Sequence, residues 1–572
     1  MVRNFVAQEL DVSAETINRL PSGEFAYGLA ANFAVTADPR SYKQAMASPS
    51  KSDWHKAMQA ELLALETLRT WRQVPTPENT PLIHCQWIYK TKKKADGTVD
   101  RYKARVVARG DQQEADSADT YAPVANMSSH RLLCSLAAHH NWPMHPIDVD
   151  TAYLNAARTG DPVFMHPPPG YNIKPGHCLE VNMALYGLRT SALDWFQCWT
   201  KAMQQLRFRK SVVDPCVFVR VENGSRTYIG IHVDDGIIVG SDLRAVEQVK
   251  SDLRKHFKIK DMGNASNVLG IQITRDKSGI YLSQQAYLNT VSERFKSLQG
   301  KAAPTPLSHH KVLNNTEPAG PVPYLQLLGS LMYAMIGTRP DPAHALGVLS
   351  RHASSPTIGH WNSLINVLEY TRSTAHLRLA YRSTSTPPRI SVYCNSDFSA
   401  DTETSRSTSG HIVLLGGHAV VWSSRRQPRV AHSTTEAEYV EMGSAAQSAI
   451  HICELLKDIE LPHLASAPAQ VHCDNEGAVK TATNGKKSYR NRHIRVDDHF
   501  VREVVQTGKV EFIPTRTKDM LADIFTKLGK NTRTNFLSCT EYSRLEVHYP
   551  AVVFHKQASV LEHCFINGQD KE

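Results

Sequence analysis

Three aspartates stand at the ends of apolar runs, where carboxylates are costly to place beside a hydrophobic core. Asp148, in Ile147-Asp148-Val149, lies at the end of a short apolar run before a helix-like segment, and Asp234 and Asp235 interrupt the segment 228–239 (YIGIHVDDGIIV). Neighbouring carboxylates repel one another, and a divalent cation offsets that repulsion. Three carboxylates are also a set that can hold two Mg²⁺ ions for in-line phosphoryl transfer. Asp-Asp-Gly is equally good turn chemistry, so the spacing alone leaves a simple solvent-facing hairpin turn open.

Positive charge is concentrated in two short stretches of an otherwise nearly neutral chain. The 572 residues contain 65 Lys and Arg against 55 Asp and Glu, a formal net charge of +10. Segment 90–109 holds eight basic residues against two acidic ones, and segment 484–495 holds five basic residues and no acid. Such clusters indicate a polyanionic partner, most often nucleic acid. Two solvated Lys/Arg loops would have the same composition.

The first basic cluster lies on an expected hairpin. Two strand-like segments, 86–94 and 98–109, flank Asp96-Gly97, a dipeptide typical of tight hairpin turns. Both arms carry cations, so the hairpin would display a ribbon of positive charge. Upstream, Ser52 is the expected N-cap of a helix with an apolar face formed by Trp54, Met58, Leu62 and Leu65.

Composition excludes several classes of protein. No apolar run approaches the roughly 20 residues needed to cross a membrane, and Arg3, Gln8 and Glu9 interrupt any signal peptide at the N-terminus. The ten cysteines are scattered without a CxxC pair. This pattern fits reduced, mostly buried thiols rather than a zinc ribbon or a disulfide framework. We therefore expect a soluble, intracellular protein.

Changes in composition divide the chain, which is too long for one domain. Residues 1–51 are expected to be a weakly structured lead-in, and prolines at 304–323 and the STSTPP run at 383–388 mark linkers. After residue 388 the pattern is three strands, a long helix from about 434 to 456, a strand at 470–473 and a further helix, an α/β arrangement. A tail at 531–572 shows no clear period.

The motifs follow one another in an order that resembles a known family. They are RYKARVVARG (101–110), YAPV (121–124), IDVDTAYLN (147–155), LYGL (185–188), HVDDGIIVG (232–240), LGIQI (269–273), GSLMYAMIGTRPD (329–341), STSG (407–410), STTEAEYV (433–440), CDN (473–475) and ADIFTK (522–527). From about residue 54 to 527 the chain resembles the reverse transcriptase–RNase H region of copia-type long-terminal-repeat retrotransposon polyproteins. The resemblance implies an α+β right-hand polymerase followed by an α/β RNase H-like domain. Fingers and palm would occupy 52–300, thumb and connection 301–388, and the RNase H-like domain 389–530.

The resemblance implies roles in a polymerase site. Asp148, Asp234 and Asp235 match the carboxylates that hold Mg²⁺ or Mn²⁺, and the metals would activate the primer 3′-hydroxyl and bridge the triphosphate. The Val149 main chain would lie along the triphosphate beside the metals. Tyr153 matches an aromatic that leaves no room for a 2′-hydroxyl, unless it is an ordinary core residue. Lys103 or Arg105 in the fingers would meet the triphosphate, and the residues expected to bind nucleic acid are Lys90, Lys92, Lys93, Lys94, Arg101, Lys486, Lys487 and Arg490.

The RNase H-like site departs from the family pattern at one position. The resemblance places its catalytic, metal-binding carboxylates at Glu436, Asp474 and Asp523. The leading aspartate of the family is replaced by Asn395, which loses a unit of negative charge where metals need neutralising. Asp397, two residues later, is the nearest acid that could join the metal site. We expect weak or absent nuclease activity.

Further departures surround the polymerase motifs. His232 precedes Val233-Asp234-Asp235 where the family has Tyr, and a protonated imidazole there would disfavour cation binding. Residues 190–193, Asp111 and Arg495 also differ from the family pattern. None removes a polymerase carboxylate, and together they resemble drift. Zinc-knuckle, protease and integrase motifs are absent, so we expect a polymerase–nuclease fragment, which would be a truncated element, a piece of a gene model or a processed unit.

The expected function is RNA-directed DNA synthesis by two-metal phosphoryl transfer. The expected partners are an RNA or DNA template with primer, dNTPs, an RNA–DNA hybrid and other products of the same polyprotein, with no membrane. The location would be the cytoplasm, a virus-like particle if the element is intact, or the nucleus. The alternative is a degenerate, catalytically silent nucleic-acid-binding remnant that keeps the fold and the basic hairpin.

Overall fold

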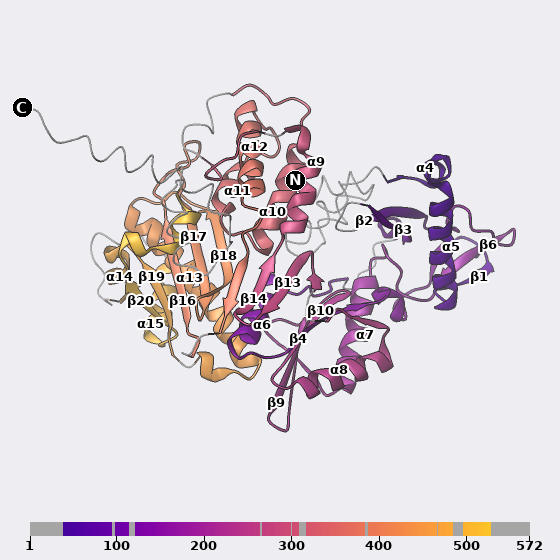
Figure 1. The fold of residues 1–572 in the computed structure, drawn as a ribbon, viewed down its shortest axis with the longest axis horizontal. Helices are drawn as coiled ribbons and strands as arrows, with labels where there is room; N and C mark the ends of the chain where they lie inside the picture. Colours follow the sequence, from indigo (N-terminus) through magenta and orange to yellow (C-terminus); the bar gives the residue numbers. More distant parts are fainter. Residues whose placement is uncertain are drawn as a thin grey trace, which may run out of the picture.

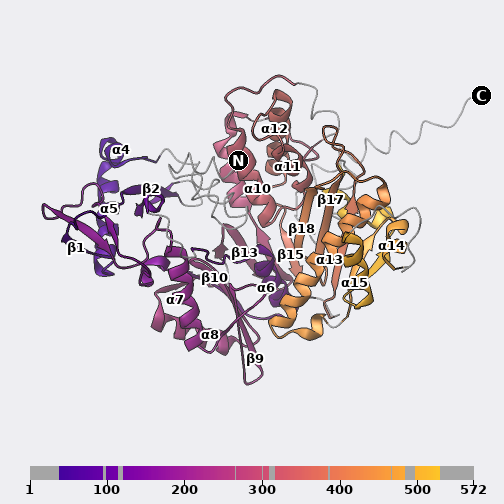
Figure 2. The same cartoon turned by 180° about the vertical axis from the view of Figure 1, so that it is seen from behind.

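The computed structural model describes residues 38–93, 98–113, 120–263, 266–298, 300–307, 316–383, 387–465, 467–483 and 496–527. In Figure 1 the chain runs from an indigo N-terminal region, through a magenta central sheet, to an orange and yellow C-terminal sheet. A group of helices stands above the centre, and the view from behind in Figure 2 shows the same order. The motifs therefore lie on successive units of one elongated molecule.

The N-terminal unit combines two helices, a hairpin and a small sheet of order β1-β6-β5. Its elements are α4 (Tyr42–Ala47), α5 (Lys51–Thr67), β1 (Trp71–Pro75), β2 (Cys85–Lys93), β3 (Val99–Ala108), β5 (Val163–Met165) and β6 (His177–Val181). Residues 38–51, assigned to the lead-in from sequence, belong to this unit. The Asp38 carboxylate accepts a hydrogen bond from the Thr91 N–H of the hairpin at 3.1 Å.

The N-cap of helix α5 is Ser50, two residues before the expected Ser52, so Ser52 lies inside the helix. Its buried residues are Trp54, Met58 and Leu65, while Leu62 is half-buried. Trp54 meets the Tyr89 ring of the hairpin edge-on, with 5.2 Å between ring centroids. The helix thus buries its apolar face against the hairpin, as its spacing predicts.

The expected hairpin is confirmed, and alternation along β2 and β3 separates charge from core. Lys90 faces Lys103, Lys92 faces Arg101, and Ile88 faces Arg105 across the two strands. Residues two apart share a face of a strand, so these five cations form one row. Trp87, Tyr89, Ala104 and Val106 are buried on the other face. Lys94 and Asp96-Gly97 at the tip, and the side chain of Lys93, lie outside the described residues.

The central unit carries the acidic residues on a sheet of order β11-β4-β10-β9-β8-β7. Its strands are β4 (Met144–Val149), β7 (Arg209–Lys210), β8 (Val217–Glu222), β9 (Ser225–His232), β10 (Asp235–Gly240) and β11 (Ile259–Asp261), and its helices are α6 (Met127–His139), α7 (Ser191–Gln205) and α8 (Leu243–His256). Ile238 shares a core with Trp199 of α7, whereas Ile237 and Val239 share a core with Leu132 of α6. By alternation, Asp235 lies on the α6 face of the sheet.

A third unit joins a four-stranded sheet to four helices. The strands are β12 (Ser266–Val268), β13 (Ile271–Asp276), β14 (Gly279–Ser283) and β15 (Leu379–Arg382), in that order. The helices are α9 (Gln285–Arg294), α10 (Tyr324–Gly337), α11 (Ala343–Ser350) and α12 (Ile358–Ser373). Because β14 pairs with β15, the end of the expected 301–388 segment returns to the sheet that begins before it.

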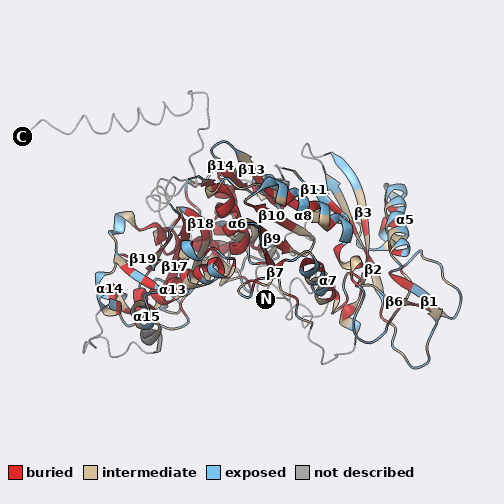
Figure 3. Cartoon of the chain, turned by 90° about the horizontal axis from the view of Figure 1, so that it is seen from below, coloured by how far each residue is buried: buried red, intermediate tan, exposed pale blue. Residues whose placement is uncertain are grey.

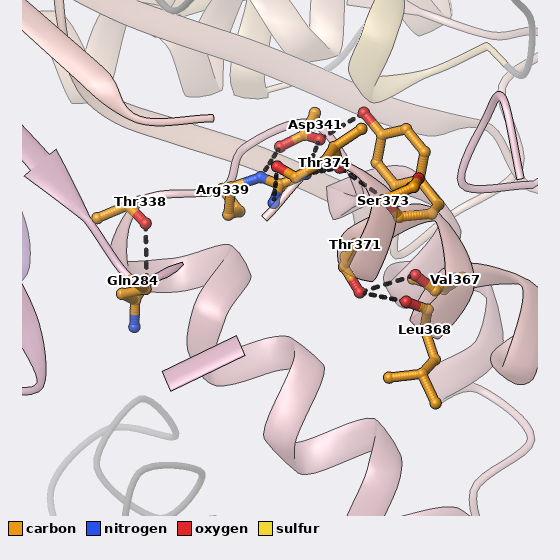
Figure 4. A network of polar contacts seen from close by, with 10 residues as sticks. Gln284, Thr338, Arg339, Asp341, Val367, Leu368, Thr371, Ser373 and Thr374 are labelled. Atoms are coloured by element: carbon orange, nitrogen blue, oxygen red, sulfur yellow. Dashed lines mark hydrogen bonds and ion pairs between the residues drawn. The ribbon is translucent and has the colours of Figure 1, made fainter. Parts of the chain in front are cut away.

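A fully buried ion pair organises these helices (Figure 4). The Arg339 guanidinium donates to both carboxylate oxygens of Asp341 at 2.9 and 2.8 Å. It also donates to the Thr374 carbonyl at 3.0 Å, and the Tyr370 hydroxyl donates to Asp341 at 2.6 Å. Buried charges need such partners, so the GTRPD motif joins α10 to the end of α12.

The C-terminal sheet has order β18-β17-β16-β19-β20, with β16, β19 and β20 parallel. Its elements are β16 (Ile390–Ser396), β17 (Thr408–Leu415), β18 (His418–Arg426), α13 (Thr434–Asp458), β19 (Ala469–Cys473), α14 (Glu476–Thr483), α15 (Val496–Gln506) and β20 (Val510–Pro514). The expected series of three strands, helix, strand and helix is confirmed. Helix α15 and strand β20 extend it.

Burial is concentrated where the central and C-terminal units meet (Figure 3). One core contains Leu132 of α6, Val239 of β10, Ile273 of β13 and Ile412 of β17. The eight cysteines among the described residues carry free thiols, and most of them are buried. No helix in the described ranges is both long and apolar enough to span a membrane.

Candidate functional site

The three predicted aspartates meet where β4 and β10 pair. Asp148 and Asp235 are direct partners across the antiparallel strands, and Asp234 lies in the two-residue turn between β9 and β10. Val233, the other turn residue, has φ +59°. Such a conformation is unusual for a β-branched side chain, and strained residues cluster at functional sites. The turn is therefore more constrained than an ordinary solvent-facing hairpin.

Three hydrogen bonds hold the turn in place. The Val149 N–H donates to the Asp234 carbonyl at 2.8 Å. The indole N–H of buried Trp195, on α7, donates to the Val233 carbonyl at 2.8 Å. The Leu269 N–H, beside β13, donates to the Asp235 carboxylate at 3.3 Å. Trp195 and Leu269 were not singled out from the sequence, because their contacts span long sequence separations.

The carboxylates share a poorly solvated position. Burial raises the pKa of Asp235 to about 7, and the neighbouring Asp234 charge adds to the effect. Burial also raises the pKa of Asp234, while the charges of Arg105 and Lys103 oppose the rise. Clustered carboxylates with raised pKa values are typical of functional sites. Because the charges of Arg105 and Lys103 act on Asp234, the cation row of the hairpin faces the acidic turn.

Lys260 is a further member of this site that the sequence did not reveal. It is the cross-strand partner of Asp148 on β11, and its ammonium lies 3.7 Å from the Asp148 carboxylate. It also forms an ion pair with Asp150. An ammonium group here partly neutralises the acids.

The oxygen donors of Asp148, Asp234 and Asp235 match the ligand preference of Mg²⁺. In the described part of the chain, no three His, Cys, Asp or Glu side chains are gathered as tightly as a preformed metal site requires. Carboxylate repulsion and the contact of Asp148 with Lys260 oppose such gathering.

Tyr153 lies beside the acidic turn on the short helix Ala152–Asn155. Its ring meets Tyr186 edge-on with 4.9 Å between centroids, and the Arg105 guanidinium lies 4.6 Å from the centre of the Tyr186 ring. Burial raises the pKa of Tyr153, and the charge of Asp234 raises it further. Arg105, Tyr186 and Tyr153 thus form a continuous series of contacts that leads from the cation row toward the acidic turn.

The remaining predicted nucleic-acid contacts divide into two groups. Lys90, Lys92 and Arg101 extend the cation row toward the tip of the hairpin. Lys486, Lys487 and Arg490 lie outside the described residues.

The sequence raises the concern that a protonated His232 would disfavour cation binding, but the imidazole is neutral near pH 7. Burial lowers the pKa of this imidazole to about 4, with the neighbouring His130 contributing. A neutral ring does not repel a cation, so the physical objection to metal binding is removed.

The second acidic group lies at the ends of β16 and β19. Asn395, nearly fully buried, donates from its amide nitrogen to Asp523 at 2.6 Å and to the Thr526 hydroxyl at 2.7 Å. Lys527 donates to the same Asp523 oxygen at 2.6 Å. Asp474 follows β19, and its charge helps to raise the pKa of Asp523 after burial. Asn395 therefore acts as a hydrogen-bond donor where a carboxylate would have supplied charge.

The carboxylate that α13 directs toward this group is Glu438. Burial raises the pKa of Glu438 to about 10, and the nearby Asp474 contributes. The thiol of Cys473, the residue before Asp474, contacts the Glu438 carboxylate at 3.8 Å. The predicted Glu436 instead accepts a hydrogen bond from the His432 N–H at 2.7 Å, ahead of the helix. The motif contains two glutamates two residues apart, so the sequence could not separate a capping role from a site role.

Asp397 lies in the loop after β16 and is bound to the main chain. Its carboxylate accepts hydrogen bonds from the N–H groups of Thr408 at 2.9 Å and Ala400 at 3.2 Å. Asp397 shapes the loop in this arrangement.

Comparison with known proteins identifies the family. The family model described as reverse transcriptase (RNA-dependent DNA polymerase) matches residues 68–309. A transposon Ty5-1 protein of Saccharomyces cerevisiae is 30% identical over 301 residues, which cover 51% of this chain and 97% of that protein. The chain belongs to the copia-type retrotransposon Pol family. The Pol polyprotein from transposon TNT 1-94 of Nicotiana tabacum is 33% identical over 520 residues, covering 88% of this chain.

The match extends beyond the polymerase motifs, yet the chain spans only 39% of the length of the TNT 1-94 polyprotein. Among solved structures, a foamy viral protease–reverse transcriptase in complex with double-stranded DNA aligns with a TM-score of 0.44 at 12% identity, over 81% of this chain and 69% of that one. The expected order of a right-hand polymerase followed by an RNase H-like α/β domain is confirmed by the family and by the two acidic sheets described above.

Proposed function

We propose that this member of the Pol family is an RNA-directed DNA polymerase acting by two-metal phosphoryl transfer. The observation that carries the proposal is the convergence of Asp148, Asp234 and Asp235 at paired strand ends, opposite a row of cations. Asp148, Asp234 and Asp235 would hold Mg²⁺ or Mn²⁺, with the Val149 main chain beside them. Bound metal would activate the primer 3′-hydroxyl and stabilise the pyrophosphate leaving group.

The chain's own side chains would orient the substrates. Arg105 and Lys103 would bind the dNTP triphosphate, because they are the cations whose charges act on Asp234. Lys90, Lys92 and Arg101 would follow template or primer phosphates along the hairpin. Tyr153, packed on Tyr186, would close the space beneath the incoming sugar and disfavour ribonucleotides.

The proposal is tested by extending a DNA primer on a homopolymeric RNA template with Mg²⁺ and the complementary dNTP. Extension by the wild type, and increased ribonucleotide use by Tyr153→Ala, are expected. Binding of primer–template without extension would favour a silent nucleic-acid-binding remnant instead.

For the RNase H-like site we propose a weak or absent nuclease with Glu438, Asp474 and Asp523 as its remaining carboxylates. The replacement of charge by the Asn395 amide, which donates to Asp523, supports this proposal. Cleavage of an RNA–DNA hybrid tests it. Any residual cleavage should be lost in Glu438→Gln and kept in Glu436→Gln, and the reverse result would return the role to Glu436.

We further propose that other products of the same polyprotein are partners and that the chain acts inside the cell, in the cytoplasm, a virus-like particle or the nucleus. The proposal rests on the family relationship, since the TNT 1-94 polyprotein is much longer than this chain.

A further inference from the structure

Helix α10 connects the RNase H-like sheet to the polymerase carboxylates. The indole N–H of Trp422, on β18, donates to the Met335 carbonyl of α10 at 3.0 Å. At the other end of the connection, the Tyr333 hydroxyl of α10 donates to the Leu269 carbonyl. The Leu269 N–H in turn donates to Asp235. A continuous series of contacts therefore joins β18 to a predicted metal ligand.

Arg131 of α6 strengthens the first contact. Its guanidinium donates to the Ile336 and Gly337 carbonyls at the end of α10, at 2.7 and 3.1 Å, and to the Val420 carbonyl of β18 at 2.8 Å. It also lies 3.8 Å from the centre of the Trp422 ring. Arg131 is nearly fully buried, and a buried guanidinium depends on such acceptors. Removing β18 would take away its ring partner and one of these carbonyls.

The contact between Tyr333 and Leu269 holds a loop whose backbone conformation is restricted. Leu269 and Gly270 both have positive φ, +53° and +68°. A Cβ on Gly270 would lie 2.6 Å from the Tyr333 hydroxyl oxygen, so the helix and the loop approach closely. The Leu269 N–H can reach Asp235 only while this loop keeps its conformation. The position of α10 therefore governs the contact made to Asp235.

Two further contacts dock the same domain onto the central unit. The Ser135 hydroxyl of α6 lies 2.8 Å from the imidazole of His418 on β18. At the far end of α13, Asp458 accepts hydrogen bonds from the Arg209 guanidinium and the Val212 N–H, both at 2.8 Å. Contacts at separated points restrain rotation as well as separation of the two units.

We propose that the RNase H-like domain serves the polymerase as a positioning element, with Trp422 and Arg131 acting through α10 and Tyr333 on Asp235. This role is independent of nuclease chemistry, so it persists although Asn395 replaces a carboxylate. The expected change in the rate of primer extension rests on the proposed polymerase function. The structural coupling between the two units can be measured without turnover.

The test uses full-length chains carrying Trp422→Phe, Tyr333→Phe and both changes together. Each single change removes one hydrogen-bond donor and keeps an aromatic ring. We expect each to lower the kcat of primer extension about fivefold to tenfold, the rate equivalent of one positioning hydrogen bond, with the KM for dNTP changed less than about twofold. Because both lie on one path, the double variant should lose little more than the more damaging single variant.

Tyr393→Phe is the matched control, because it removes a hydroxyl from β16 of the same domain outside the path. Hydrogen exchange in residues 266–276 gives a readout that does not need activity. Trp422→Phe should speed exchange there and Tyr393→Phe should not, even if the wild type fails to extend primers. Multiplicative kinetic losses, or exchange confined to the RNase H-like domain, would overturn the proposal.

Discussion

Replacing Asp235 with asparagine should stabilise the metal-free protein above neutral pH. The pKa of Asp235 is raised from an ordinary value near 3.8 to about 7 by burial and by Asp234. A raised carboxyl pKa contributes stability that is complete below the unfolded-state pKa and is lost as pH rises through the folded-state pKa. The loss approaches about 1.4 kcal/mol for each pH unit between the two pKa values and levels off near the folded-state pKa, so between pH 5 and 7 the wild type should lose about 2 kcal/mol relative to the variant. The asparagine oxygen can still accept the Leu269 N–H.

Thermal unfolding in a chelator, with wild type and Asp235→Asn compared at pH 5 and pH 8, measures this difference. The advantage of the variant should grow between the two pH values, and excess Mg²⁺ should reverse it by stabilising only the wild type. Asp252→Asn, on α8, where Asp252 forms an ion pair with Lys255 away from the acidic turn, provides a control for loss of one acidic residue. An advantage that is independent of pH would refute the assignment of the raised pKa to Asp235, and equal stabilisation by Mg²⁺ would refute the metal role.

Three further predictions concern charge at named positions. In steady-state primer extension, Arg105→Ala should raise the KM for dNTP about tenfold. Arg101→Ala should chiefly reduce the salt dependence of template binding. An equal rise in the KM for dNTP in both variants would contradict separate roles. Arg339→Met should lower the free energy of unfolding by about 3–5 kcal/mol, and adding Asp341→Leu should restore part of the loss in urea unfolding; a neutral single variant would contradict the buried pair. Asn395→Asp should increase cleavage of a labelled RNA–DNA hybrid, and strong wild-type cleavage would show that the amide is tolerated.

The polymerase carboxylates and the hairpin were predictable because their signals are local. Asp234 and Asp235 interrupt an apolar run, and Asp148 ends another, so the paired strands bring all three together as expected. The alternation of residues 86–109 likewise determines which face carries cations. The metal and nucleotide roles of these residues stay predictions.

The remaining contacts could not be predicted because they depend on packing between distant segments. Trp195, Leu269 and Tyr333 act through main-chain carbonyls or N–H groups, which any sequence supplies. Whether Glu436 or Glu438 faces the second acidic group depends on how the start of α13 packs against β19, which the sequence does not show. The sequence also did not predict the final strand, 510–514, because five residues give only a weak alternating pattern. Val510 and Phe512 are both buried, and they alternate with more exposed positions as in a strand.

The most direct test of the central claim is single-turnover incorporation of one dNTP into a primer on an RNA template, with Mg²⁺ varied. The account predicts metal-dependent incorporation by the wild type and by Asp252→Asn. It predicts a loss of at least about a hundredfold in Asp234→Asn/Asp235→Asn, because two of the three metal-binding carboxylates are removed, with primer–template affinity kept. Wild-type incorporation no faster than that of the double variant, at equal binding, would contradict the claim that Asp148, Asp234 and Asp235 form a working polymerase site.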